Sequence, residues 1–110
     1  MAIKLIKKEN GLERKTSDSY SVLNLLTADD SDKVSLAVSS AKNHNEITKT
    51  TSDRAYFILK GELIINDNLF AKIGDVVFIS ADTEYNFRGS FKAVLINSPP
   101  FKKKNELKKF

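Results

Sequence analysis

Few side chains in this sequence are able to carry acid–base or metal chemistry, since it holds one histidine and no cysteine. The histidine, His44, lies in the polar stretch KNHNE, and an imidazole titrates near neutral pH, so His44 is a candidate general base. A single histidine on a polar strand edge is more often a surface or rim residue, which is the alternative for His44. Without cysteine the chain has no disulfide, zinc-thiolate site or catalytic thiol, which fits a reducing compartment.

Two other groups match known chemical patterns only in part. Asp29, Asp30 and Asp32 lie close together, but the glycine and distal glutamate of a calcium-binding EF-hand loop are missing, so we expect a solvated turn. Ser80 has no glycine elbow beside it, which argues against serine hydrolysis.

Short apolar or alternating segments separated by turn residues must position these side chains, and no segment shows a helical period of 3.6 residues. About nine such strands with tight turns predict an all-β sandwich or closed barrel, such as a jelly roll, because closure removes exposed sheet edges. The expected strands are Ala2–Ile6, Tyr20–Leu26, Lys33–Ser40, His44–Thr48, Arg54–Lys60, Glu62–Asn66, Val76–Ile79, Glu84–Arg88 and Phe91–Asn97.

The length of 110 residues fits one domain, for which we expect a β-barrel over residues 1–101 and a flexible basic tail over residues 102–110. The tail holds five lysines and one glutamate, which account for the whole net charge of +4. A neutral body without a basic face predicts no nucleic-acid binding. The first residues, MAIKLIKKEN, are too short and too often charged for a signal peptide or a membrane span, so we expect a cytoplasmic protein that does not enter a membrane.

From Arg54 to Phe101 the sequence resembles the cupin superfamily of small RmlC-like jelly-roll proteins. The stretch RAYFILKGEL (54–63) is similar to the end of the first cupin motif, with Gly61 as its turn glycine. GDVVFISADTEYNF (74–87) is similar to the second motif, and FKAVLINSPPF (91–101) resembles the closing strand with its proline exit. The resemblance implies a cupin-type double-stranded β-helix, that is, a jelly-roll barrel.

The same resemblance implies that the usual metal ligands are missing. The place of the family's glutamate falls at Arg54, and the place of its second-motif histidine falls at Tyr85. The first two histidine places fall near Thr48 and Thr50, or at Ile47 and Lys49 if the gap is one residue longer. A guanidinium is a permanent cation that only donates hydrogen bonds and would repel a metal, so we expect no metal and no cofactor.

Strand alternation then implies which side chains line the barrel. Arg54, Tyr56 and Ile58 would share the inward face of one strand, and Tyr85 and Phe87 that of another. Arg54 would receive a carboxylate or phosphate of a ligand, or else it would pair with Asp53 or Glu84 at the rim. The candidate ligand-binding residues are Arg54, Tyr85, Tyr56, Thr48, Thr50 and Phe87, and the candidate catalytic residues are Tyr85 and His44.

These interpretations favour a metal-free cupin that binds a small anionic or sugar-like metabolite. One alternative is a metal-independent sugar or sugar-acid isomerase, epimerase or lyase with Tyr85 as acid and an unidentified base. A second alternative is a structural module that acts through its dimer face and basic tail. Phe57 and Leu59 would lie on the outer face of RAYFILK, which suits a homodimer formed through sheet faces.

Overall fold

The computed structural model describes residues 3–102 and the backbone of residues 106–109. A short 3-10 helix, η1 (Lys8–Asn10), precedes eight strands that join in one antiparallel, strongly curved sheet. The strands are β1 (Leu12–Ser17), β2 (Tyr20–Leu26), β3 (Ser35–Thr50), β4 (Asp53–Ile65), β5 (Leu69–Ala71), β6 (Val76–Ile79), β7 (Tyr85–Ser98) and β8 (Glu106–Lys109). The predicted all-β jelly-roll barrel is confirmed.

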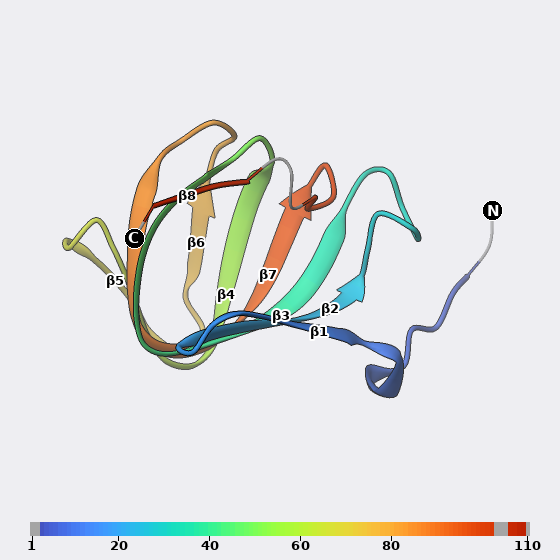
Figure 1. Cartoon of the computed structure of the whole chain (residues 1–110), viewed down its shortest axis with the longest axis horizontal. Coiled ribbons are helices and arrows are strands. Elements are labelled where there is room, and N and C mark those ends of the chain that lie inside the picture. Colours follow the sequence, from blue (N-terminus) through green and yellow to red (C-terminus); the bar gives the residue numbers. More distant parts are fainter. Residues whose placement is uncertain (1–2, 103–105, 110) are drawn as a thin grey trace.

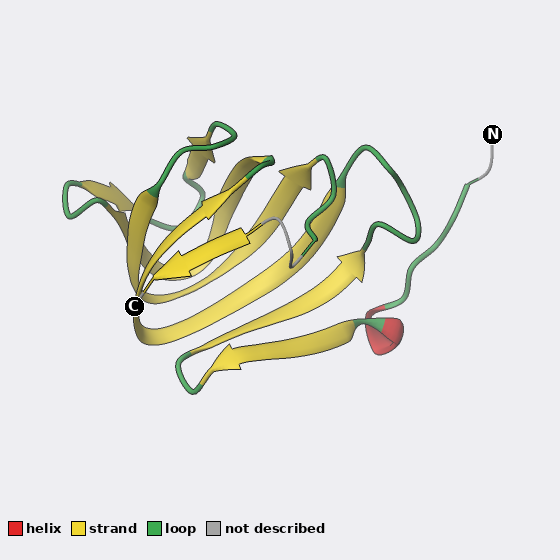
Figure 2. Cartoon of the chain, turned by 45° about the horizontal axis from the view of Figure 1, so that its top comes forward, coloured by secondary structure: helices red, strands yellow, loops and turns green. Residues whose placement is uncertain are grey.

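Three long strands, β3, β4 and β7, build both walls of the barrel because each bends around its base (Figure 1). Their halves pair in two layers. One layer has the order β1-β2-β3-β7-β4-β6 and uses residues 35–41 of β3. The other has the order β8-β3-β7-β4-β5 and uses residues 44–50 of β3, so that β8 is its edge strand (Figure 2). The core lies between the two layers and is rich in aromatic and β-branched side chains.

The predicted breaks inside the long strands are bends rather than turns. Residues 33–40 and 44–48, expected as two strands, form the single strand β3, with a register shift between Ala41 and His44. Gly61, expected to reverse the chain, instead continues β4 with a φ of 76°, and Gly89 bends β7 with a φ of 126°. A glycine in a strand can mark a bend as well as a turn, and the local pattern is the same for both.

At the chain ends the expectations were less accurate. The strand expected at residues 2–6 is absent from residues 3–6, where Ile3 and Leu5 are 99% and 80% exposed. The strand β1 was not predicted, because the sequence LERKTS lacks apolar alternation. Residues 106–109 of the tail pair with β3, and the flexibility expected of the tail stays a prediction. Within the part of the chain that the structure describes, no helix is long and apolar enough to cross a membrane.

Candidate active site

The barrel interior contains polar and charged side chains because each long strand directs alternate residues inward. On β3 the buried residues His44, Glu46, Thr48 and Thr50 alternate with more exposed neighbours. Buried polar groups of this kind need partners, since leaving one unsatisfied costs about 1–3 kcal/mol. His44 has partners in the β1–β2 turn and on its own strand, and Thr50 contacts the backbone of Ser52.

Arg54 is the centre of the first polar cluster. Its guanidinium is 3% exposed, and it donates from Nε to Asn97 Oδ1 at 2.8 Å and from Nη1 to Tyr85 Oη at 3.0 Å. The Tyr85 hydroxyl also lies 2.6 Å from Tyr56 Oη. Asp53, considered as an ion-pair partner of Arg54, is exposed and accepts a hydrogen bond from the backbone of Ala81. The structure therefore brings Arg54, Tyr56 and Tyr85 together on one hydrogen-bonded chain.

The expectation that His44 lies at the surface or rim is wrong, because the side chain is only 3% exposed. His44 Nε2 lies 2.7 Å from Glu46 Oε1, and Nδ1 lies 2.7 Å from Ser19 Oγ. Its ring stacks on Tyr20, with 4.8 Å between ring centroids and 14° between planes. The polar stretch around His44 looked like a surface edge because its inward residues are polar as well.

Phe87 lies between the two clusters and joins them into one site. Its ring centroid is 5.4 Å from that of His44, 6.0 Å from Tyr85 and 6.3 Å from Tyr56. In the pairing of β3 with β7, Glu46 is opposite Phe87, and Thr48 is opposite Tyr85. Because diagonal neighbours on a sheet lie about 7–8 Å apart, the Glu46 carboxylate and the Tyr85 phenol are within reach of one small molecule.

The remaining predicted residues line the same wall. Thr48 is 1% exposed and Thr50 is 3% exposed, both inside the barrel. Thr50 Oγ1 accepts a long hydrogen bond of 3.5 Å from the backbone of Ser52. In the alternative register Ile47 would be a site residue, but its side chain is 37% exposed on the outer face.

The buried tyrosines are held in their neutral form. Desolvation by burial, partly opposed by the Arg54 charge, raises the pKa of Tyr20 and raises the pKa of Tyr56 well above its ordinary value of 10.0. The negative form of Tyr85 also contributes to the higher pKa of Tyr56. At neutral pH these phenols are therefore hydroxyl groups that can donate hydrogen bonds.

Four members of the site escaped the sequence analysis, namely Ser19, Tyr20, Glu46 and Asn97. A local signal existed for Glu46, because it is two residues from His44 and must share its face of the strand. Asn97 faces Arg54 through the pairing of β4 with β7, and Ser19 reaches His44 through a turn. Neither contact has a signature in the sequence.

Among residues 3–102, the structure shows no group of three or more histidine, cysteine, aspartate or glutamate side chains that could hold a metal ion. Around Arg54 the polar groups that meet are a fixed cation and two phenols, whereas metal sites in proteins are built mainly from carboxylates, imidazoles and thiolates. Independence from metals stays a prediction.

No family model matches the sequence, and no curated protein matches it. Similar solved structures include Pac13, ectoine synthase, KdgF and oxalate decarboxylase, which are cupin-type β-barrels, and this confirms the fold inferred from the motifs. Pac13 from Streptomyces, described as a unique nucleoside dehydratase, is 15% identical to this chain with a TM-score of 0.79. The matched region covers 98% of this chain and 92% of the Pac13 chain.

Two further structures also match over nearly the whole of both chains. Ectoine synthase from P. lautus is 14% identical, has a TM-score of 0.75, and covers 100% of this chain and 91% of its own. KdgF from Halomonas sp. is 6% identical, has a TM-score of 0.74, and covers 94% of this chain and 99% of its own. Identities this low show a shared fold and no more.

Proposed function

We propose that this cupin-fold chain binds a small hydroxylated or anionic metabolite of the nucleoside or sugar class in the barrel and transfers protons on it. The reaction that fits best is a metal-independent elimination of water. One observation carries the proposal: the hydrogen-bonded Glu46–His44 pair in one layer and Arg54 with Tyr56 in the other face the same barrel interior, where Tyr85 bonds to both Arg54 and Tyr56. In this proposal Glu46, hydrogen-bonded to His44, would act as the base.

Elimination needs a base for the proton on carbon and an acid for the departing hydroxyl group. Glu46 would take the proton, the C–H electrons would form the new double bond, and the C–O bond would break. Tyr85 would give its proton to the departing oxygen, so that water leaves. Arg54, 3.0 Å from Tyr85 Oη, would stabilise the phenolate that remains.

The comparisons support this class of ligand. Structures of Pac13 variants, in which a histidine or one of two tyrosines is replaced, are described with uridine. The candidate site in this chain is also built around one histidine and several tyrosines. Ligand binding without reaction is the second candidate, favoured by the buried guanidinium, which could hold a carboxylate or phosphate.

The first test incubates the chain with uridine, other nucleosides, sugar acids and sugar phosphates in deuterium oxide. Proton NMR then follows exchange of carbon-bound hydrogen and the appearance of alkene protons. We expect Glu46→Gln and Tyr85→Phe to slow turnover at least 100-fold, because positioned acids and bases contribute about 10²–10⁴ in rate. Full turnover in Glu46→Gln would contradict the assignment of the base.

A thermal-shift screen on the same compounds separates catalysis from binding. A ligand at about 100 times its Kd stabilises the fold by about 2.7 kcal/mol. We expect Arg54→Ala to lose this shift. Arg88→Ala is the matched control, because Arg88 is a partly exposed arginine outside the site, and its Nε donates a hydrogen bond of 2.8 Å to Asp67. A shift that depends on Arg54, with no turnover of any compound, would establish the binding function and refute the elimination.

A further inference from the structure

The β1–β2 turn brings a hydroxyl group to the back of the buried His44–Glu46 pair. Ser19 is in that turn, and its carbonyl accepts a hydrogen bond of 2.9 Å from the backbone of Lys42, which fixes the turn against β3. Next to Lys42, Asn43 has a φ of 47° and the pairing register of β3 shifts, so that His44 turns inward. Ser19 Oγ and His44 Nδ1 consequently meet at 2.7 Å although they are 25 residues apart.

Ser19 also borders the solvent. It lines a surface cavity of about 380 Å³ together with Ser17, Asp18, Lys15 and Lys42. Such a polar cavity is filled by water in solution. Ser19 is half-buried, whereas His44 and Glu46 are 3% and 1% exposed. One hydroxyl group therefore separates the buried pair from water on the side away from Tyr85.

We propose that Ser19, His44 and Glu46 form a proton relay between the barrel interior and this cavity. Only the purpose of the relay rests on the proposed function. That purpose is to remove from Glu46 the proton that it has taken from a bound metabolite. Both ring nitrogens of His44 have partners at 2.7 Å, so the imidazole is placed to pass protons between two groups.

The transfer balances without leaving a new charge on serine or histidine. When Glu46 is ionised, Nε2–H donates to the carboxylate, and Nδ1 accepts from the Ser19 hydroxyl. When Glu46 is protonated on Oε1, both donors reverse, so that Oε1–H donates to Nε2 and Nδ1–H donates to Ser19 Oγ. Changing from the second pattern to the first moves one proton from Glu46 to Nε2, one from Nδ1 to Ser19 and one from Ser19 to water.

Ser19 is a positioning residue in this scheme, because it acts on a ligand only through His44 and Glu46. The relay allows the base to exchange its proton while a ligand occupies the barrel. It also gives a role to the Ser19 hydroxyl, which lies against the buried His44 ring.

The test uses the fact that the chain has a single histidine, so its imidazole signals in NMR spectra have only one source. The rate at which the His44 ring N–H exchanges with water is measured on the full chain without any ligand. The two test variants are Ser19→Thr and Ser19→Val, which have the same shape and differ by one hydroxyl group. Ser21→Ala is the control, because Ser21 lines the same cavity.

We expect ring N–H exchange in Ser19→Val to be at least tenfold slower than in Ser19→Thr, with Ser21→Ala like the unchanged chain. Equal rates in the two Ser19 variants would overturn the relay. If β-branched residues prevent folding at the turn, Ser19→Ala is compared with Ser17→Ala, which removes the hydroxyl 3.3 Å from Ser19 Oγ, and the same slowing is required. Since no substrate is used, a chain with a working relay and no turnover would refute the proposed reaction alone.

Discussion

The hydroxyl group of Tyr85 links a buried charge to a second phenol. It lies 3.0 Å from a guanidinium nitrogen of Arg54 and 2.6 Å from the hydroxyl of Tyr56. Arg54, Tyr56 and Tyr85 are each no more than 3% exposed, so their hydrogen bonds are made inside the protein. The same burial gives the tyrosines an unusual response to alkaline pH.

Above pH 10 we expect the free energy of unfolding to fall. Burial raises the pKa of Tyr20 and the pKa of Tyr56 above the ordinary 10.0, so the folded chain keeps two protons that the unfolded chain loses. Below pH 10 both states are protonated, and this contribution to stability is fully present. As the pH rises, stability falls by about 1.4 kcal/mol per pH unit for each tyrosine until the folded form also ionises.

Absorbance at 295 nm during an alkaline titration, together with urea unfolding between pH 9 and 11.5, measures this effect. At most one of the three tyrosines should ionise before the protein unfolds. Tyr20→Phe should remove about half of the pH dependence of the unfolding free energy. Normal ionisation of all three phenols in the folded protein would show that the tyrosines are not held in the neutral form.

At the scale of elements, the bends of β4 and β7 decide which side chains face one another. A Cβ added to Gly61 would lie 2.1 Å from Ser90 O, and a Cβ added to Gly89 would lie 2.4 Å from Glu62 O. Both glycines have positive φ angles and lie where the paired strands pass from one layer to the other. This crossing brings Tyr85, at the start of β7, over Arg54, at the start of β4.

We expect Gly89→Ala to destabilise the fold by more than about 3 kcal/mol, because it adds a backbone clash to an unfavourable φ. Gly74→Ala is the matched control: its φ is 89°, but a Cβ there would meet nothing within 4 Å, so only the conformational cost of about 1–3 kcal/mol applies. Urea denaturation of both variants measures the difference. Equal losses of stability would mean that the close approach of β4 and β7 is not what requires Gly89.

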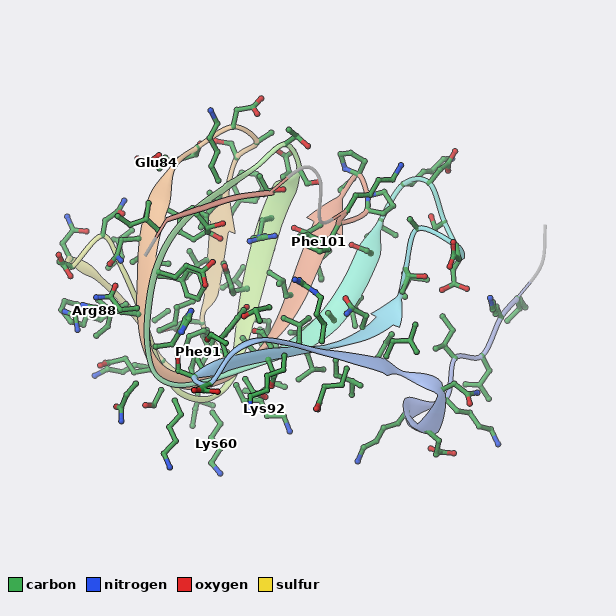
Figure 3. The ribbon with its side chains drawn as sticks, viewed as in Figure 1. Lys60, Glu84, Arg88, Phe91, Lys92 and Phe101 are labelled. Atoms are coloured by element: carbon green, nitrogen blue, oxygen red, sulfur yellow. The ribbon has the colours of Figure 1, made fainter. Side chains whose placement is uncertain are left out.

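At the scale of the whole molecule, an apolar patch remains on the outside of the barrel. It consists of Phe57 and Leu59 on β4, each 42% exposed, and Val76 and Phe78 on β6, each 64% exposed. The patch is continuous because Phe57 pairs with Val76 in the sheet. Figure 3 shows Lys60, the residue that follows Leu59 on β4, at the base of the barrel.

An exposed apolar patch on a sheet face suits a second copy of the same chain, because a twofold axis places the patch of one copy against that of the other. We therefore expect a homodimer that uses this face, measured by sedimentation at increasing protein concentration. Phe57→Glu should shift the mass to that of the monomer, whereas Leu12→Glu changes an exposed leucine on β1 outside the patch and should not. A monomeric mass for the unchanged chain at high concentration would rule out the dimer.

Much of the fold could be predicted because its signals are local. Alternation of apolar residues identified most strands, and the motifs around Gly61 and Gly74 indicated the jelly-roll barrel. Alternation also implied that Arg54 and Tyr56 share one face of a strand and that Tyr85 and Phe87 share another. What failed was the distinction between bends and turns, since Gly61 has a positive φ that either structure could use.

By itself, then, the sequence determined the barrel type and the alternation of faces, and it placed Arg54 and Tyr85 as inward-facing side chains. Only the tertiary structure decided that His44 is buried, that Glu46 holds one of its nitrogens, and that Ser19 holds the other. The physical reason is the sequence distance over which each feature is determined. The face of a side chain follows from its own strand, whereas its partners depend on register shifts and bends that bring distant strands together.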